Sequence, residues 1–135
     1  MRLRTMTGIG LVMIVTLVGA AAGATRQAPK WVLLGQRAVT DRVDHDVILV
    51  TAAKGDFRRI KLTVQRASVD FHKVVIHFGD DTKQEVEMRH TIAAGGETRA
   101  IDLPGTDRVI RSVEFWYDAN TARGRRAVVR LLGLR

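Results

Sequence analysis

Three aspartates within six residues form the densest group of carboxylates in this chain of 135 residues. Asp41, Asp44 and Asp46 lie in the segment DRVDHD, and oxygen-rich loops of this kind can hold Ca²⁺. The segment lacks the D-x-D-x-D-G order of a helix–loop–helix calcium site, and its arginine and histidine reduce its negative charge. We therefore favour a solvated loop and keep a metal site at the three aspartates as the alternative.

Four histidines could bind zinc only if the fold gathered them, because the chain contains no H-E-x-x-H motif. They are His45, His72, His77 and His90. On a regular strand His72 and His77 would leave opposite faces, unless an irregularity rotates one of them. His90 is in phase with nearby apolar residues, which predicts a partly buried, hydrogen-bonded histidine. We expect no metal and no other cofactor.

Nucleophilic catalysis has few candidate residues here. The chain has no cysteine, which also excludes disulfides, and its two serines, Ser68 and Ser112, lie within or beside predicted strands. Neither serine lies in a G-x-S-x-G elbow. The sequence therefore favours a non-enzymatic protein.

Arginines and an aspartate surround the turn predicted at Pro104-Gly105. Arg99 and Asp102 precede the turn and Arg108 follows it, so a hairpin would bring opposite charges face to face. This structural interpretation needs no ligand. The alternative is a fork of Arg99, Arg108 and Arg111 that holds a carboxylate, sulfate or phosphate, although Asp102 would neutralise part of it.

The candidate ligand contacts are a partly exposed tryptophan and the basic tip of the last predicted hairpin, where Arg123, Arg125, Arg126 and Arg130 lie around Gly124. Trp116 alternates with Phe115 and Tyr117, so it should point away from the core and could support a sugar ring or acyl chain. The alternative is that the segment around Trp31 covers it. The candidate binding residues are Arg111, Trp116, Arg123, Arg125, Arg126 and Arg130.

The elements that must position these residues are strands, because apolar residues recur with period two along most of the chain. Ile60, Leu62 and Val64, for example, alternate with polar residues. Turn signals separate the apolar runs. We predict strands at 31–39, 46–52, 58–66, 69–78, 84–92, 98–103, 108–118 and 126–134.

One predicted strand changes phase inside itself. Val69 and Phe71 are apolar at odd positions, whereas Val74 and Ile76 are apolar at even ones. Only an extra residue keeps both sets on one face, so we predict a β-bulge at His72-Lys73. The run VILV at 47–50 is apolar on both faces, which indicates a central or covered strand.

About eight short strands in a chain of this size predict an antiparallel β-sandwich, with a small closed barrel as the alternative. We expect one domain at 31–135, preceded by a disordered lead-in at 25–30. Residues 1–24 have a basic start, an apolar run and small residues at the end, which is typical of a secretory signal peptide. We expect cleavage near Ala24, with an uncleaved anchor as the alternative.

The charge of the expected mature chain favours acidic partners. Without Arg2 and Arg4, 20 of the 22 Lys and Arg residues remain against 14 Asp and Glu, a net charge of +6 with neutral His. Outside the cytoplasm this charge suits anionic polysaccharide, lipid head groups or an envelope protein better than nucleic acid. The alternative is that it serves only solubility.

Five segments together resemble a domain-of-unknown-function family of small exported bacterial proteins. They are WVLLG, FRRIKLTVQRASVDF, IAAGGETRAIDL, DRVIRSVEFWY and RAVVRLLG, and the likeness covers nearly all of residues 31–133. The resemblance implies export and an all-β domain. It implies no activity and no catalytic residues.

These observations predict a secreted or periplasmic binding or envelope-associated module for an anionic or carbohydrate ligand, with no transmembrane segment in the mature chain. Two alternatives from other classes remain. One is a metal-dependent hydrolase built on Asp41, Asp44, Asp46 and the histidines. The other is a structural subunit that adds a strand to a partner through an exposed sheet edge.

Overall fold

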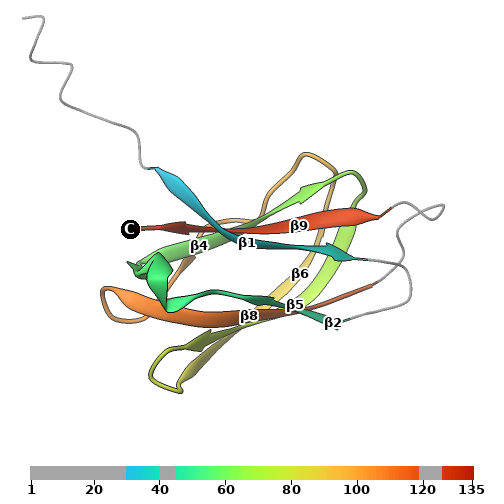
Figure 1. Cartoon of the computed structure of the whole chain (residues 1–135). Coiled ribbons are helices and arrows are strands. Elements are labelled where there is room, and N and C mark those ends of the chain that lie inside the picture. Colours follow the sequence, from blue (N-terminus) through green and yellow to red (C-terminus); the bar gives the residue numbers. More distant parts are fainter. Residues whose placement is uncertain (1–29, 40–44, 119–125) are drawn as a thin grey trace, which may run out of the picture.

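Two antiparallel sheets stacked face to face make up the part of the chain that the structure describes (Figure 1). The computed structural model describes residues 30–39, 45–118 and 126–135. The four-stranded sheet has the order β1 (Trp31–Val39), β9 (Ala127–Leu134), β4 (Arg59–Gln65), β7 (Ile101–Asp102). The five-stranded sheet has the order β2 (His45–Leu49), β8 (Arg108–Asp118), β5 (Val69–Phe78), β6 (Lys83–Ile92), and β3 (Asp56–Phe57) also pairs with β8.

The predicted β-sandwich is confirmed, and the closed barrel is wrong, because no strand pairing among the described residues joins one sheet to the other. Alternation along each strand places one set of side chains between the sheets. On β4, Ile60, Leu62 and Val64 are fully buried while Arg59 and Gln65 are exposed. The apolar period read from the sequence is therefore the period of the core.

The strand predicted at 58–66 is confirmed as β4, but the sequence analysis missed the short strand β3, which precedes it in the other sheet. β3 pairs with β8, and the chain then crosses at Arg58 to β4, which pairs with β9. The Arg58 N–H donates to the Leu134 carbonyl at 2.8 Å across this crossing. Pairing between distant segments decides such a switch, so the local apolar pattern did not reveal it.

The strand predicted at 46–52 ends earlier than expected, and it lies at the edge of its sheet and not in the centre. β2 ends at Leu49, and a 3₁₀ turn, η2 (Ala52–Lys54), follows it. β2 is an edge strand that pairs with β8, and the Leu49 side chain is 75% exposed. The prediction that VILV forms a central or covered strand is therefore wrong.

The prediction of a hairpin around Pro104-Gly105 is also wrong. β7 pairs with β4 in one sheet, whereas β8 lies in the other sheet, so the turn carries the chain between sheets. The turn chemistry was recognised correctly, but a turn does not specify which strands pair on either side of it.

The predicted β-bulge is confirmed. Phe71 pairs with Tyr117 and Lys73 with Trp116, so β5 has one extra residue, His72, against β8. A second irregularity faces it on the next strand, because Phe71 pairs with His90 and Lys73 with Glu87, which gives β6 an extra residue against β5. Bulges re-aim side chains, and these two lie side by side.

The signal peptide predicted at 1–24 and nearly all of the lead-in predicted at 25–30 lie outside the described residues. Lys30 alone of these is described, and it is exposed ahead of β1. Within the described ranges, no helix has the length and apolar character needed to cross a bilayer.

Candidate binding surface on the five-stranded sheet

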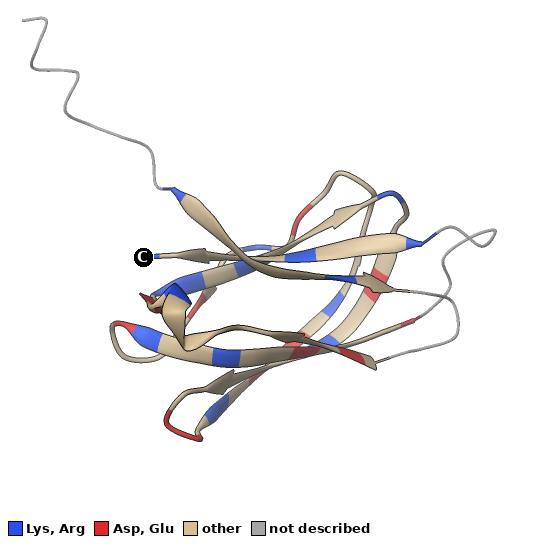
Figure 2. Ribbon diagram, in the orientation of Figure 1, with Lys and Arg blue, Asp and Glu red and all other residues tan. Residues whose placement is uncertain are grey.

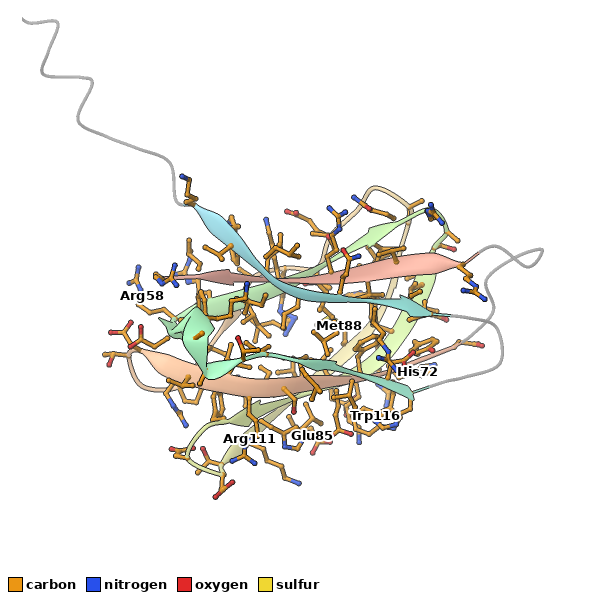
Figure 3. All side chains as sticks on the ribbon, in the orientation of Figure 1. Arg58, His72, Glu85, Met88, Arg111 and Trp116 are labelled. Carbon is orange, nitrogen blue, oxygen red and sulfur yellow. The ribbon has the colours of Figure 1, made fainter. Side chains whose placement is uncertain are left out.

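A hollow of about 440 Å³ lies over the two bulges. Trp116, Lys73 and Glu87 face one another in a row across β8, β5 and β6, and they form its floor. The lining residues are His72, Lys73, Glu87, Arg89, Trp116 and Tyr117. Figure 3 shows His72 close to Trp116, with Arg111 farther away. The volume falls within the range of small-molecule sites, about 300–1,000 Å³.

Two neighbours cover the ring of Trp116. His45 stacks on it with ring centroids 4.5 Å apart, and the Lys73 ammonium lies 4.4 Å from the ring centroid. Because β2 and β5 flank β8 on opposite sides, the two neighbours approach the indole from opposite sides. The predicted outward orientation is confirmed, but an open platform for a sugar ring is not available, and only the ring edge remains for a ligand.

Trp31 does not cover Trp116. It lies at the start of β1 in the other sheet, where the Lys61 ammonium is 4.3 Å from its ring centroid. The alternative based on the amino-terminal segment is therefore wrong, because the two tryptophans belong to different sheets.

Next to Trp116, one carboxylate bridges two histidines. Glu114 Oε2 lies 2.7 Å from His45 Nε2, and Glu114 Oε1 lies 2.5 Å from His77 Nε2. Partial burial raises the pKa of Glu114, but the hydrogen bonds to His77 and His45 outweigh burial and leave the pKa below its ordinary value. The sequence analysis missed this bridge, since only the register of β2, β8 and β5 brings the three residues together.

The remaining histidines form no metal site. His90, expected to be partly buried, is exposed on β6, because β6 is the edge of its sheet and leaves the outermost position open to solvent. His72 lines the hollow. Among the described residues, no group of three or more His, Asp or Glu side chains is arranged to hold a metal ion.

Of the three aspartates considered as metal ligands, Asp41 and Asp44 lie outside the described residues. Both oxygens of the third, Asp46, are engaged. Arg37 Nε lies 3.1 Å from Oδ1, and the Tyr117 hydroxyl donates to Oδ2 at 2.8 Å. The carboxylate thus connects β1, β2 and β8.

The three residues expected to pair across a hairpin have other partners. Asp102 pairs with Arg59 of β4 at 2.7 Å. Arg108 donates to the Pro104 carbonyl at 3.1 Å, which fixes the turn, and to both oxygens of Asp80 at 3.1 and 3.2 Å. Arg99 is exposed. Their predicted mutual pairing is wrong because β7 and β8 belong to different sheets.

Hydrogen bonds donated by the Thr82 side chain and backbone, with a further contribution from Arg108, lower the pKa of Asp80. Asp80 and Thr82 lie at the turn between β5 and β6, and a second hollow of about 360 Å³ adjoins this turn. Arg108 also covers the Phe78 ring there, 3.9 Å from its centroid. The arginine is therefore fixed in place at this end of the sandwich.

The candidate binding residues do not form one surface. Arg111 is paired with Asp81 at the β5–β6 turn, well away from Trp116 along β8. Arg126 precedes β9 and Arg130 lies on it, in the four-stranded sheet. The basic hairpin expected there is wrong, because β8 belongs to the other sheet and does not pair with β9 within the described ranges. Arg123 and Arg125 lie outside the described residues. The structure divides the described members of the set between the two sheets.

No curated protein matches this chain. The fold is similar to part of the structure of AlgX from Pseudomonas aeruginosa, with a TM-score of 0.50 and 20% sequence identity. The match covers 77% of this chain and 26% of that chain, and at this identity it shows the fold alone. The family described as "Domain of unknown function (DUF2541)" matches residues 10–133, and the chain therefore belongs to the DUF2541 family.

Proposed function

We propose that this protein is an exported, non-enzymatic binding module for an anionic carbohydrate. The observation that carries the proposal is the hollow over the two bulges, which combines the cationic side chains of Lys73 and Arg89 with the edge of Trp116. Carbohydrate sites commonly combine an aromatic surface with a few polar groups that fix orientation. Export is supported by the signal-like character of residues 1–24.

Arg89 is the main specific contact that we propose for a carboxylate of the ligand. Its side chain is 79% exposed, and among the described residues it forms an ion pair only with Glu87, two positions away on the same strand, at 3.1 Å. A guanidinium can pair with a carboxylate through two parallel hydrogen bonds. Its backbone has a φ of 22°, and strained residues of this kind are concentrated at functional sites.

Lys73 supplies the second charge of the proposed site. Its ammonium lies over Trp116 and 3.5 Å from Glu85, so its position is fixed from both sides. Preorganised side chains lose little entropy on binding. The ligand would therefore lie along the row formed by Trp116 and Lys73, with its acidic group toward Arg89.

Tryptophan fluorescence tests this proposal directly, because the chain contains only two tryptophans. In a Trp31→Phe background the emission reports on Trp116 alone. Titration with polygalacturonate should change the emission with saturation, and the affinity should fall as salt rises. Neutral dextran is the control polymer, and an equal response to it would contradict the requirement for charge.

Arg89→Gln should weaken polygalacturonate binding by about tenfold, the effect of losing one charge-assisted contact worth about 1.5 kcal/mol. Lys83→Gln is the matched control, because Lys83 lies on the same strand but outside the hollow. An equal loss in both variants would mean that net charge alone attracts the polymer. Release of new reducing ends during incubation would overturn the non-enzymatic assignment.

A further inference from the structure

The two sheets differ in the charge of their strands. β1, β4 and β9 carry basic residues but no acidic ones, whereas the strands of the five-stranded sheet carry both (Figure 2). The basic residues of the four-stranded sheet are Arg37, Arg59, Lys61 and Arg130, and its one strand carboxylate is Asp102 on the short β7. Lys30 and Arg126, both exposed, lie at the starts of β1 and β9.

Ion pairs neutralise one side of this sheet and leave the other side cationic. At the β4–β7 side, Arg59 pairs with Asp102 at 2.7 Å and Lys61 pairs with Glu97 at 3.0 Å. At the β1–β9 side, Arg37 pairs with Asp46 of β2 at 3.1 Å, whereas Arg130 donates to the neutral Gln36 at 3.1 Å. The positive charge that no described carboxylate compensates therefore lies at Arg130 on β9 and at Lys30 and Arg126, at the starts of β1 and β9.

An apolar stripe runs between these cations on the outer face. Leu33 faces Leu132, and Ala38 faces Val128, across the β1–β9 pairing. Leu33 is 43% exposed and Ala38 is exposed, while Trp31, Val128 and Leu132 are partly exposed. We define the apolar stripe as these five residues: Trp31, Leu33, Ala38, Val128 and Leu132. No described element covers it (Figure 1).

We propose that the apolar stripe and the cations beside it dock this protein on an anionic lipid bilayer. Aliphatic and tryptophan side chains can enter the head-group region while Lys and Arg contact anionic head groups, and surface-bound helices use the same combination. Trp is also favoured at the bilayer interface. A soluble polyanion would need the cations but not an exposed apolar stripe between them.

Charge argues against a second copy of the chain as the occupant. A two-fold symmetric contact through this face would place the cations along β1 and β9 of one copy close to those of the other. Like charges opposite one another disfavour such a contact, whereas the head groups of an anionic bilayer neutralise them.

The test is co-sedimentation with vesicles of phosphatidylcholine with and without phosphatidylglycerol. Every protein is prepared with the same amino terminus, so that the segment before Lys30 contributes equally in each arm. We expect binding to the anionic vesicles that weakens as salt rises. Arg130→Gln should reduce the affinity about fivefold, the effect of one cation near an anionic surface. Leu33→Ser should reduce it about tenfold through lost apolar insertion.

Matched controls come from the opposite sheet. Leu49→Ser removes a side chain that is 75% exposed on β2, and Lys83→Gln removes a cation from β6. Neither should change vesicle binding. Circular dichroism verifies that each variant folds, and Arg130→Gln keeps the test independent of any instability of Leu33→Ser.

Three results would overturn the docking proposal. They are absence of binding to anionic vesicles, equal losses in the test and control variants, and a dimer that Leu33→Ser converts to a monomer. Retention of polygalacturonate binding by Leu33→Ser and Arg130→Gln would separate this face from the hollow. The docking proposal can therefore fail without the failure of the proposed function.

Discussion

The inner face of the five-stranded sheet contributes aromatic side chains to the core, whereas that of the four-stranded sheet contributes aliphatic ones. The fully buried aromatic residues are Phe57, Phe71, Phe78, Phe115 and Tyr117, all on β3, β5 and β8. Those facing them from β4 and β9 are Ile60, Leu62, Val64, Val129 and Leu131. Large groups on one sheet thus pack against smaller ones on the other.

Two glycines of the four-stranded sheet extend this difference. A Cβ at Gly35 would lie 2.6 Å from Ile48 Cγ2 of β2, and a Cβ at Gly133 would lie 2.7 Å from Phe57 Cδ1 of β3. The four-stranded sheet therefore provides space into which side chains of the other sheet fit. The five-stranded sheet thus supplies the aromatic bulk of the core, and the glycines of the four-stranded sheet leave room for it.

The outer faces differ as well. The five-stranded sheet has adjoining bulges, a hollow and the Glu114 bridge, while the four-stranded sheet presents an apolar stripe between cations. Bulges disturb the regular alternation and re-aim side chains, which suits a shaped site for a small group. A more regular sheet gives a broad face, which suits an extended surface.

Truncation of a buried aromatic residue should have the largest effect on stability. Phe115 contacts Phe71 and Tyr117 at ring-centroid distances of 5.9 and 5.6 Å. We expect Phe115→Ala to cost about 4–5 kcal/mol in free energy of unfolding, and Leu62→Ala on the other sheet about 3 kcal/mol. Urea denaturation measures both. Equal costs would contradict the view that the aromatic sheet dominates the core.

Filling the space at Gly35 should have the next largest effect. Gly35→Ala should cost about 1–3 kcal/mol, because the new methyl group overlaps Ile48. In an Ile48→Ala background the same substitution should cost less, since the overlapping atom is gone. A double-mutant cycle measured by urea denaturation tests this. An additive cycle would show that the glycine does not accommodate Ile48.

Removal of the charge of Glu114 should have a moderate effect that depends on pH. The lowered pKa of Glu114 means that its carboxylate stabilises the fold above the ordinary value of 4.5, and this stabilisation is lost as the pH falls through the lower folded pKa. Glu114→Gln should therefore cost about 1 kcal/mol at neutral pH and much less in acid.

Chemical denaturation at a series of pH values measures this difference. Glu85→Gln is the control, because Glu85 is exposed and pairs with Lys73 at 3.5 Å without a histidine. The role of the bridge would be rejected if the gap between wild type and Glu114→Gln stayed constant with pH.

The exposed pair on the four-stranded sheet should have the smallest effect. The Asp102 side chain is 78% exposed, and solvent screens its pairing with Arg59. We expect Asp102→Asn to change the free energy of unfolding by at most about 0.5 kcal/mol, and less in high salt. Thermal unfolding at low and high salt checks this. A larger loss would mean that β7 depends on this pair.

Local alternation was enough to predict most of the strands and the residues that face the core. Alternation along β4 and β8 is a local property, because successive side chains leave a strand on opposite faces. The phase change at His72 was sufficient to predict the bulge, since a single strand must keep its apolar side chains on one side. The outward position of Trp116 follows from the same rule.

The pairing of the strands, and with it the composition of each surface, depends on contacts between segments far apart in the chain. Asp102 lies opposite Arg59 and not Arg108, and Glu114 lies between His45 and His77, because pairing joins segments that are distant in sequence. The sequence could not show that Trp116 and Arg130 lie on different sheets. Alternation tells which side chains of a strand share a face, but it does not tell which strands lie beside it. The candidate surfaces are products of that pairing.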